Sequence, residues 1–208
     1  MIITQITPQK LHQNLITLSD GSSFLLDKDI CLQNSLMTDM ELTTEEIKNL
    51  KFDSQYQRAR SRALWYLDRM DYTEAKLYEK LILKGFDKKA SAAAIKRLKE
   101  NGLVDDRRYA ERLAERLLES RVSKREALQK LLYRKVPINI AKEVLEGFSV
   151  DEEEQILELL KTKYASKLEL ENGYQKVYAA LVRKGFSYSE VRSALKKYTD
   201  DIEFSEEY

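Results

Sequence analysis

A short pattern returns every 50 residues through most of this 208-residue chain. The stretch LILKGF at residues 81–86 recurs as LVRKGF at 181–186, and LLYRKV lies halfway between them at 131–136. When the chain is aligned against itself at this offset, apolar residues share columns. These columns are Leu77, Ala127 and Val177; Tyr78, Leu128 and Tyr178; Leu81, Leu131 and Leu181; and Ile82, Leu132 and Val182. Such periods are typical of stacked structural units.

The spacing inside each copy predicts helices. The four columns stand at i, i+1, i+4 and i+5, which places them in one apolar stripe on a helix. One further amphipathic segment precedes each stripe and another follows it, so each unit is predicted to hold three helices. The expected helices are 56–69, 73–84, 88–101, 106–120, 123–134, 138–147, 151–165, 173–184 and 188–198.

The first 30 residues are predicted to form a small antiparallel sheet. Ile16 and Leu18 alternate with polar residues, Asp20-Gly21 is a strong hairpin signal, and Phe24 and Leu26 share one face of a return strand. Thr43, with Glu46 three residues later, forms a capping box that is expected to open a short helix near residue 44.

The predicted fold class is therefore mainly α, with three tandem three-helix repeats forming an elongated curved body and a small N-terminal antiparallel β segment. We divide the chain into five parts. These are the β-rich segment with a short helix at 1–50, repeats at 56–105, 106–148 and 151–198, and an acidic tail at 199–208.

Helix capping explains the repeated tag without a ligand. Gly85 and Gly185 take the first position beyond a helix, where a positive φ is needed, and Phe86 and Phe186 are expected to fold back onto the apolar stripe. Further caps are predicted at Ser123, Ser187, and Asp71 or Thr73. The middle copy has Lys135 and Val136 at the tag positions, so its cap is expected to be strained or differently shaped.

Charge is unevenly distributed along a chain whose net charge is only +1. Residues 51–148 hold 24 Lys/Arg against 15 Asp/Glu, whereas 1–50 and 149–208 each carry a net charge of −4. A basic middle suits a polyanion or an acidic protein groove, although a charged helix face is also commonly just solvated. Both interpretations stay open on composition alone.

Two basic clusters and the tags supply the candidate binding residues. Arg108, Arg112 and Arg116 stand at i, i+4 and i+8, where a row of guanidinium groups can meet phosphates or carboxylates. Glu111, Glu115 and Glu119 are interleaved with this row, so local ion pairs are the alternative. The candidate residues for a protein or DNA partner are Lys88, Lys89, Lys96, Arg97, Arg107, Arg108, Arg112, Arg116, Arg134, Lys135, Arg183 and Lys184.

The sequence argues against most enzyme chemistry. Cys31 is the only cysteine and His12 the only histidine, so no internal disulfide, zinc cluster or Cys/His triad is expected. The six glycines are scattered singly and form no phosphate loop. Adjacent Asp105 and Asp106 could hold magnesium, but aspartates at a helix start more commonly serve as caps. We expect no catalytic residue, metal or cofactor.

A DNA-binding transcription factor is the main alternative to a repeat-built binding module. Residues 74–101 have the proportions of a helix-turn-helix, and Lys88, Lys89 and Lys96 could face a groove. The same hairpin recurs in every unit, however, and reading one DNA sequence would not call for three copies. The absence of a long apolar run or a basic-apolar leader favours a cytoplasmic protein.

Specific motifs resemble the RecX family of recombination regulators. The stretch RALWYLDRMDYTEAKLYEKLILKGF at 62–86 matches the family's first two helices, and 173–198 resembles its third unit. The junction motif is formed by Leu98, Gly102, Leu103, Val104, Asp105, Asp106, Arg108, Tyr109 and Ala110. The resemblance covers roughly residues 56–198, and 1–45 is similar to the extension of longer members. Lys135-Val136 and ESRVSKRE at 119–126 depart from the pattern.

The resemblance implies a non-enzymatic modulator of the RecA recombinase. Family members bind the filament that RecA forms on single-stranded DNA, lie in its groove, hinder its growth and lower its ATPase and strand-exchange activity. The implied partners are the RecA filament and, weakly and without sequence preference, single- and double-stranded DNA. We expect a monomer that takes part in DNA repair, homologous recombination and the SOS response.

Overall fold

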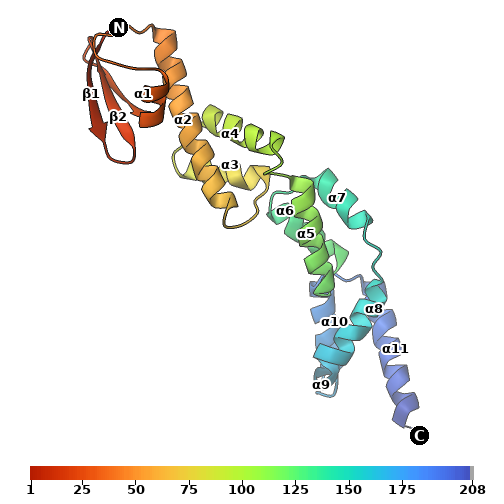
Figure 1. The fold of residues 1–208 in the computed structure, drawn as a ribbon. Helices are drawn as coiled ribbons and strands as arrows, with labels where there is room; N and C mark the ends of the chain where they lie inside the picture. Colours follow the sequence, from red (N-terminus) through yellow and green to blue (C-terminus); the bar gives the residue numbers. More distant parts are fainter. Residues whose placement is uncertain (207–208) are drawn as a thin grey trace. The chain divides into compact units, whose positions relative to one another are not determined.

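A computed structural model describes the backbone of residues 1–206 and the side chains of residues 1–200 (Figure 1). The chain divides into two compact units, residues 1–105 and residues 106–208. The described part is mainly helical, with one three-stranded sheet at the N-terminus. This confirms the predicted fold class of helical repeats behind a small antiparallel sheet.

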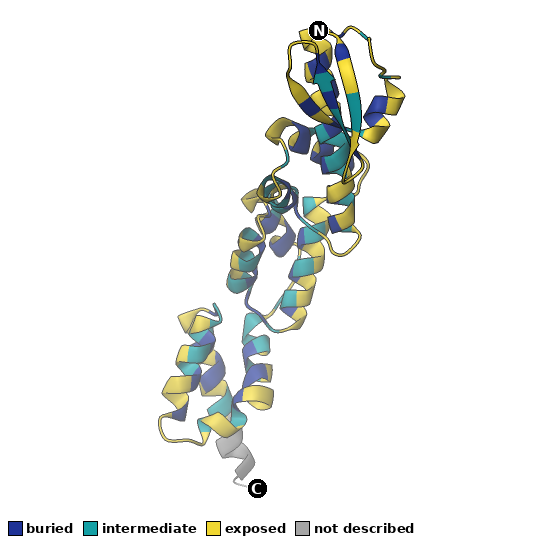
Figure 2. Ribbon diagram, turned by 90° about the vertical axis from the view of Figure 1, so that its left-hand side faces the viewer, coloured by how far each residue is buried: buried dark blue, intermediate teal, exposed yellow. Residues whose placement is uncertain are grey.

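The sheet of the first unit is antiparallel in the order β1 (Ile3–Gln9), β2 (Gln13–Leu18), β3 (Ser23–Asp27). Ile16 lies opposite Phe24, as the alternating pattern predicts. Gly21 closes the hairpin with φ +81°. Buried and exposed residues alternate along β3, whereas most of β1 is exposed or half-buried (Figure 2). The buried side packs on the short helix α1 (Lys28–Gln33) and on Ile47 and Leu50.

Helix α2 (Thr44–Leu67) is longer than the sequence patterns indicated. Thr43 forms the predicted capping box with Glu46, but the expected short helix and the expected helix 56–69 are one continuous helix. No proline or glycine interrupts residues 44–67. The first half contributes Ile47 to the core under the sheet, and the second half contributes Ala59 to the core of the first repeat.

The rest of the first unit completes a three-helix repeat. Helices α3 (Glu74–Leu83) and α4 (Lys88–Glu100) follow α2 as predicted, within one or two residues at each end. Thr73 caps α3 by accepting a hydrogen bond from the backbone N–H of Lys76 at 3.3 Å. Leu77 and Leu81 of the stripe are fully buried against Ile95 and Leu98.

The second unit contains two further groups of helices. The first is α5 (Asp106–Glu119), α6 (Lys124–Tyr133) and α7 (Ile138–Glu146), with its own buried core. The second is α8 (Glu152–Leu159), the π-helical turn η1 (Leu160–Tyr164), α9 (Ala165–Leu168), α10 (Gly173–Arg183) and α11 (Tyr188–Glu206). Ser123 caps α6, and Ser187 forms a capping box with Glu190.

Two expectations for the last group need correction. The helix expected at 151–165 is interrupted by η1, where the Thr162 hydroxyl donates a hydrogen bond to the carbonyl oxygen of Glu158 at 2.7 Å. Bonds of this kind compete with the regular helical ladder. The last helix, expected to end at 198, continues through Glu206 into the expected acidic tail. Residues 207–208 of that tail lie outside the described residues.

The repeated tag is a helix-ending turn in all three copies. Gly85 has φ +82° and Gly185 has φ +89°. Lys135 takes the same left-handed region with φ +65°, and Val136 behind it is buried. The middle cap is therefore strained, since a non-glycine residue pays a steric cost there, but it is not differently shaped.

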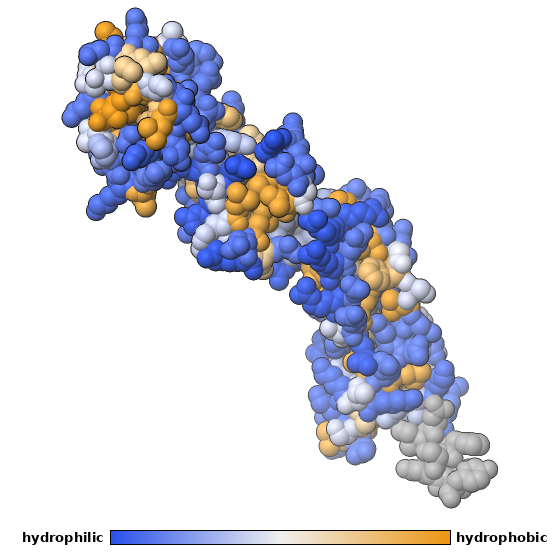
Figure 3. Space-filling view, in the orientation of Figure 1, coloured by the Kyte–Doolittle hydropathy of each residue, from blue (hydrophilic) through white to orange (hydrophobic). Residues whose placement is uncertain are grey.

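Polar residues cover much of the surface visible in Figure 3, and apolar residues gather in limited patches. Within the described part of the chain, no helix is long and apolar enough to cross a membrane.

Candidate functional site

The outer face of α4 carries the first group of candidate residues. Lys88, Lys89, Lys96 and Arg97 are all exposed. They face solvent because the opposite side of the helix is buried in the repeat core. That buried side consists of Ala90, Ser91, Ala94, Ile95 and Leu98. Packing of the helix thus forces the lysines outward, whatever they bind.

Ion pairing differs among these cations. Arg97 Nη1 lies 3.3 Å from Glu100 Oε2, and Lys99 Nζ lies 2.7 Å from Glu74 Oε2 on α3. Within the described side chains, Lys88, Lys89 and Lys96 form no ion pair. These three ammonium groups therefore add positive charge to the exposed side of α4.

Arg107 has a structural position at the start of α5. Its Nε lies 3.2 Å from Glu111 Oε1, and its Nη1 lies 2.9 Å from Glu143 Oε2 on α7. The hydrogen bond with Glu143 raises the pKa of Arg107 above its ordinary value. A guanidinium that bridges two helices in this way is less available to an outside ligand than its sequence position indicated.

The arginine row of α5 lies on the exposed side of the helix. Arg108, Arg112 and Arg116 are exposed, whereas Ala110 and Ala114 are buried on the other side. Glu111, expected to pair locally, does so with Arg107. The three arginines therefore share the exposed side of α5, as the i, i+4, i+8 spacing suggested, and their binding to a phosphate or carboxylate stays a prediction.

The remaining candidates lie at the helix-ending turns. Arg134 and the positive-φ Lys135 are exposed at the end of α6. Arg183 is exposed in the last turn of α10. Lys184 caps that helix, and its carbonyl oxygen accepts a hydrogen bond from the Ser123 hydroxyl at 2.8 Å. The main chain of Lys184 therefore has a structural role that the sequence did not reveal.

Stacking of the two helix groups in the second unit brings Arg183 beside residues that sequence analysis missed. A shallow hollow of about 340 Å³ is lined by Arg125 and Gln129 of α6 and by Arg183 and Tyr188. Arg125 and Tyr188 are exposed. No local pattern marks them, because their proximity depends on a contact between residues about 60 positions apart.

The residues whose side chains could take part in catalysis or bind a metal occupy structural positions in the fold. Cys31 is buried in the core under the sheet, and this burial raises the pKa of its thiol. Asp106 is the first residue of α5, where an acidic side chain favours the helix dipole. His12 is exposed with φ +60°, in the turn between β1 and β2. His12 also lies near Asp27 and Asp29.

Two family models match the chain. The first three-helix domain of RecX matches residues 59–98, and the third three-helix domain of RecX matches residues 151–195. These ranges fall on α2 to α4 and on α8 to α11. The matched segments are therefore the two helix groups that contain the tags with glycine.

Relatives extend the match over nearly the whole chain. "Regulatory protein RecX" of Clostridium tetani is 28% identical, with 95% of each chain covered. The protein of the same name from Caldanaerobacter subterraneus subsp. tengcongensis is 29% identical, covering 94% of this chain and 98% of the relative. The Streptococcus mutans protein of that name is 29% identical over all of this chain and 80% of its own length.

Solved structures share the fold. A crystal structure of regulatory protein RecX superposes with a TM-score of 0.68, at 23% identity, over 94% of this chain and 98% of the other. RecX from Lactobacillus salivarius gives a TM-score of 0.62, at 19% identity, over 70% and 97%. The three-helix domains, the near full-length relatives and the shared fold agree: the chain belongs to the RecX family of regulatory proteins.

Proposed function

We propose that this protein binds the filament that the RecA recombinase forms on single-stranded DNA and inhibits it. Binding hinders growth of the filament, favours its disassembly and lowers its ATPase and strand-exchange activity. The protein would thereby moderate DNA repair, homologous recombination and the SOS response. The observation that carries this proposal is the match to RecX three-helix domains at both 59–98 and 151–195.

Surface charge supports a binding role rather than a catalytic one. Lys88, Lys89 and Lys96 stand on one exposed helix face without an ion-pair partner among the described side chains. Tandem units allow one molecule to make several weak contacts with a repeating partner, which raises the overall affinity. Contact with DNA alone would be non-specific, with a Kd of roughly 10⁻⁴ to 10⁻⁶ M at physiological salt. We place this action in the cytoplasm and assign it to a monomer without a cofactor.

Titration against the single-strand-dependent ATPase of RecA tests the proposal. Protein added below one molecule per RecA is expected to lower the ATPase rate, both during filament growth and on filaments formed beforehand. An unchanged rate under both conditions would contradict the proposal. A variant with Lys88, Lys89 and Lys96 changed to Glu is expected to inhibit less.

Lys161, Lys163 and Lys167 provide a matched control for that variant. They are also exposed, and they lie in the second unit near the π-helical turn. Their change to Glu alters the net charge equally, so it separates a local contact from a general effect of charge. Equal loss of inhibition in the two triple variants would assign the effect to net charge.

A helix-turn-helix DNA-binding protein is the second candidate. The unpaired lysines of α4 favour it, since α3 and α4 form a helix hairpin with these lysines on the exposed side. A footprint on one defined duplex sequence, unaffected by RecA, would support this candidate. Uniform protection that disappears with added salt would exclude it.

A further inference from the structure

A hollow of about 580 Å³ in the first unit combines aromatic, basic and acidic side chains. One wall comes from the second half of α2 and includes Arg58, Arg62 and Trp65. Phe86, from the tag after α3, extends this wall. The other wall comes from the β1–β2 turn and the start of α1. The volume lies within the range of sites that hold small molecules or single groups of a larger ligand.

The wall formed by α2 and Phe86, here called the basic wall, combines aromatic rings with guanidinium groups. Trp65 is 45% exposed, which is unusual for a side chain with so much apolar surface. The guanidinium carbon of Arg69 lies 3.5 Å from the Trp65 ring centroid. The guanidinium carbon of Arg62 lies 5.2 Å from that centroid, and that of Arg58 lies 5.9 Å from the Phe86 centroid. Within the described side chains, neither arginine forms an ion pair. Their charges are therefore available for an anion entering the hollow.

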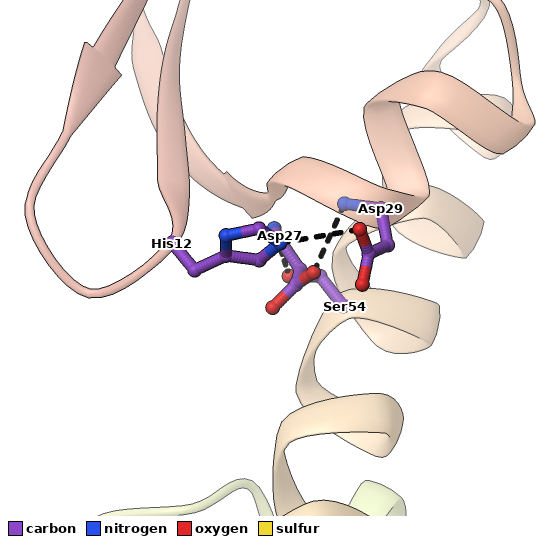
Figure 4. A network of polar contacts seen from close by, with 4 residues as sticks. All are labelled: His12, Asp27, Asp29 and Ser54. Carbon is purple, nitrogen blue, oxygen red and sulfur yellow. Dashed lines mark hydrogen bonds and ion pairs between the residues drawn. The ribbon is translucent and has the colours of Figure 1, made fainter.

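The acidic wall is held in place by hydrogen bonds. His12 Nε2 lies 3.1 Å from Asp29 Oδ1 (Figure 4). The Asp27 carboxylate accepts a hydrogen bond from the backbone N–H of Asp29 at 3.1 Å. The backbone N–H of Asp27 donates to the hydroxyl of Ser54 at 2.7 Å, and Ser54 is buried on α2. The wall opposite the arginines is therefore fixed to the same helix that carries them.

The opposite charges of the two walls restrict which ligands could bind in the hollow. An acidic peptide would suit Arg58 and Arg62 but would be repelled by Asp27 and Asp29. In a nucleotide, the negative charge lies on the phosphate and the base is neutral. Some bases also carry an amino group that can donate a hydrogen bond. Base stacking on aromatic side chains combined with backbone contacts to basic residues is the usual mode of single-strand binding.

We propose that this hollow binds one unpaired nucleotide of a single DNA strand. The base stacks on Trp65 in place of the Arg69 guanidinium, the phosphates contact Arg58 and Arg62, and Asp29 accepts a hydrogen bond from the amino group of the base. The inference rests on the proposed function in that it names where the protein meets the strand. It also assigns a role to the N-terminal sheet, which positions the acidic wall.

The acidic wall implies a preference among bases. Cytosine carries an amino donor at N4, whereas thymine carries a carbonyl acceptor at O4. Both are pyrimidines of similar size, so oligo-dC and oligo-dT make a matched pair. A hydrogen bond of this kind is expected to favour oligo-dC roughly two- to tenfold. Asp29→Ala is expected to remove the difference, by lowering the affinity for oligo-dC and by raising that for oligo-dT, whose O4 acceptor then no longer faces a carboxylate.

Trp65 is the only tryptophan of the chain, so its fluorescence reports on this hollow directly. The full-length protein is titrated with oligo-dC and oligo-dT in a buffer containing EDTA, without RecA. EDTA prevents a divalent cation from occupying His12, Asp27 and Asp29. We expect saturable quenching by both oligonucleotides, at a lower concentration for oligo-dC.

Variants test each wall through the anisotropy of a labelled oligonucleotide. Trp65→Ala is expected to weaken binding roughly tenfold, as for the loss of one stacked base. Tyr133→Ala is the control, since Tyr133 is 77% exposed in the other unit. With two phosphate contacts, the hollow contributes about −1.4 to the slope of log affinity against log salt, and Arg62→Ala should reduce this by about 0.7. Arg192→Ala removes an equal charge elsewhere. Circular dichroism checks that each variant is folded.

Several results would overturn the proposal. Oligonucleotide binding seen by anisotropy without a change in Trp65 fluorescence would place the strand elsewhere. Quenching by an acidic peptide but not by either oligonucleotide would assign the hollow to a protein partner. Equal effects of Trp65→Ala and Tyr133→Ala would remove the stacking role. These measurements contain no RecA, so their failure is distinct from a failure of the ATPase titration.

Discussion

Gly85 and Gly185 occupy equivalent turns in the first and third repeats, yet their surroundings differ. Both have a left-handed backbone, with φ +82° and +89°. A Cβ atom added to Gly85 would meet nothing within 4 Å, whereas one added to Gly185 would lie 2.4 Å from Ser123 Oγ. The backbone therefore favours glycine at both turns, while packing requires it only at Gly185.

The difference follows from how the repeats are joined. In the second unit, the Ser123 hydroxyl both accepts the N-cap hydrogen bond of α6 and donates to the carbonyl oxygen of Lys184. The turn after α10 is thus pressed against the start of α6. The turn after α3 has open space at Gly85, and Phe86 next to it is only partly buried and lines the hollow with Trp65. The same tag is therefore packed against a neighbouring helix in the third repeat and exposed at the surface in the first.

Gly185→Ala is expected to have the largest effect on stability. It combines left-handed strain with overpacking against Ser123, and together these are expected to lower the free energy of unfolding by roughly 2–4 kcal/mol. Urea denaturation followed by circular dichroism measures the change. In a double-mutant cycle, Gly185→Ala is expected to cost less in a Ser123→Gly background, where the clash with the hydroxyl is gone, than in the wild type. An equal cost in the two backgrounds would mean that strain alone accounts for the effect.

Gly85→Ala is expected to cost less, about 1 kcal/mol, because only backbone strain opposes it. The same denaturation experiment applies, and the two substitutions are chemically identical. A loss as large as that of Gly185→Ala would show that the open space beside Gly85 is absent in solution.

Lys135→Gly is expected to raise the free energy of unfolding, in contrast to the two glycine substitutions. Lys135 has φ +65°, so glycine relieves strain at the middle turn, although the added freedom of the unfolded chain offsets part of the gain. We expect a net stabilisation of about 0.5 kcal/mol. A destabilisation would indicate that the exposed Lys135 side chain makes a favourable interaction that outweighs the strain.

Substitution of Glu152 is expected to have the smallest effect on stability. This residue lies at the same contact between the second and third repeats. Its Oε1 accepts a hydrogen bond from the backbone N–H of Lys124 at 2.6 Å. Burial raises the pKa of Glu152 above its ordinary value, and nearby Glu190 acts in the same direction. A raised pKa in the folded state means that the stabilising contribution is present at low pH and is lost as pH rises through the folded-state pKa.

Glu152→Gln tests this pH dependence. Glutamine stays neutral at every pH. The stability of the variant relative to the wild type, measured as the difference in their free energies of unfolding, should therefore be higher at about pH 7 than at about pH 4. Glu154→Gln, an exposed neighbour on the same helix, serves as the control. A relative stability that does not change with pH would contradict a raised pKa.

The helices could be predicted well from the sequence because each repeat buries a local stripe such as Leu77 and Leu81. The continuity of α2 could not, since its two halves face different cores and the polar stretch between them resembles a break. The left-handed Lys135 could be anticipated only by comparison with Gly85 and Gly185. Local patterns thus determine the elements, and long-range packing determines how they join.

The candidate basic residues could be placed on exposed helix faces for the same reason, since an amphipathic pattern fixes the outward side. Their partners could not be predicted: Arg107 meets Glu143, which lies 36 residues away. The hollow of the first unit was missed because Trp65, Phe86 and Asp29 come from separate segments. Whether any of these residues contacts RecA or DNA stays a prediction.

The ATPase of RecA at raised salt tests the filament proposal most directly. Salt is first increased until the protein alone no longer binds single-stranded DNA, while RecA still hydrolyses ATP on it. We predict that substoichiometric protein still lowers the ATPase rate under these conditions, because it contacts the filament itself. Inhibition that disappears together with its own DNA binding would show that it only competes for the strand, and would contradict the proposed action on the filament.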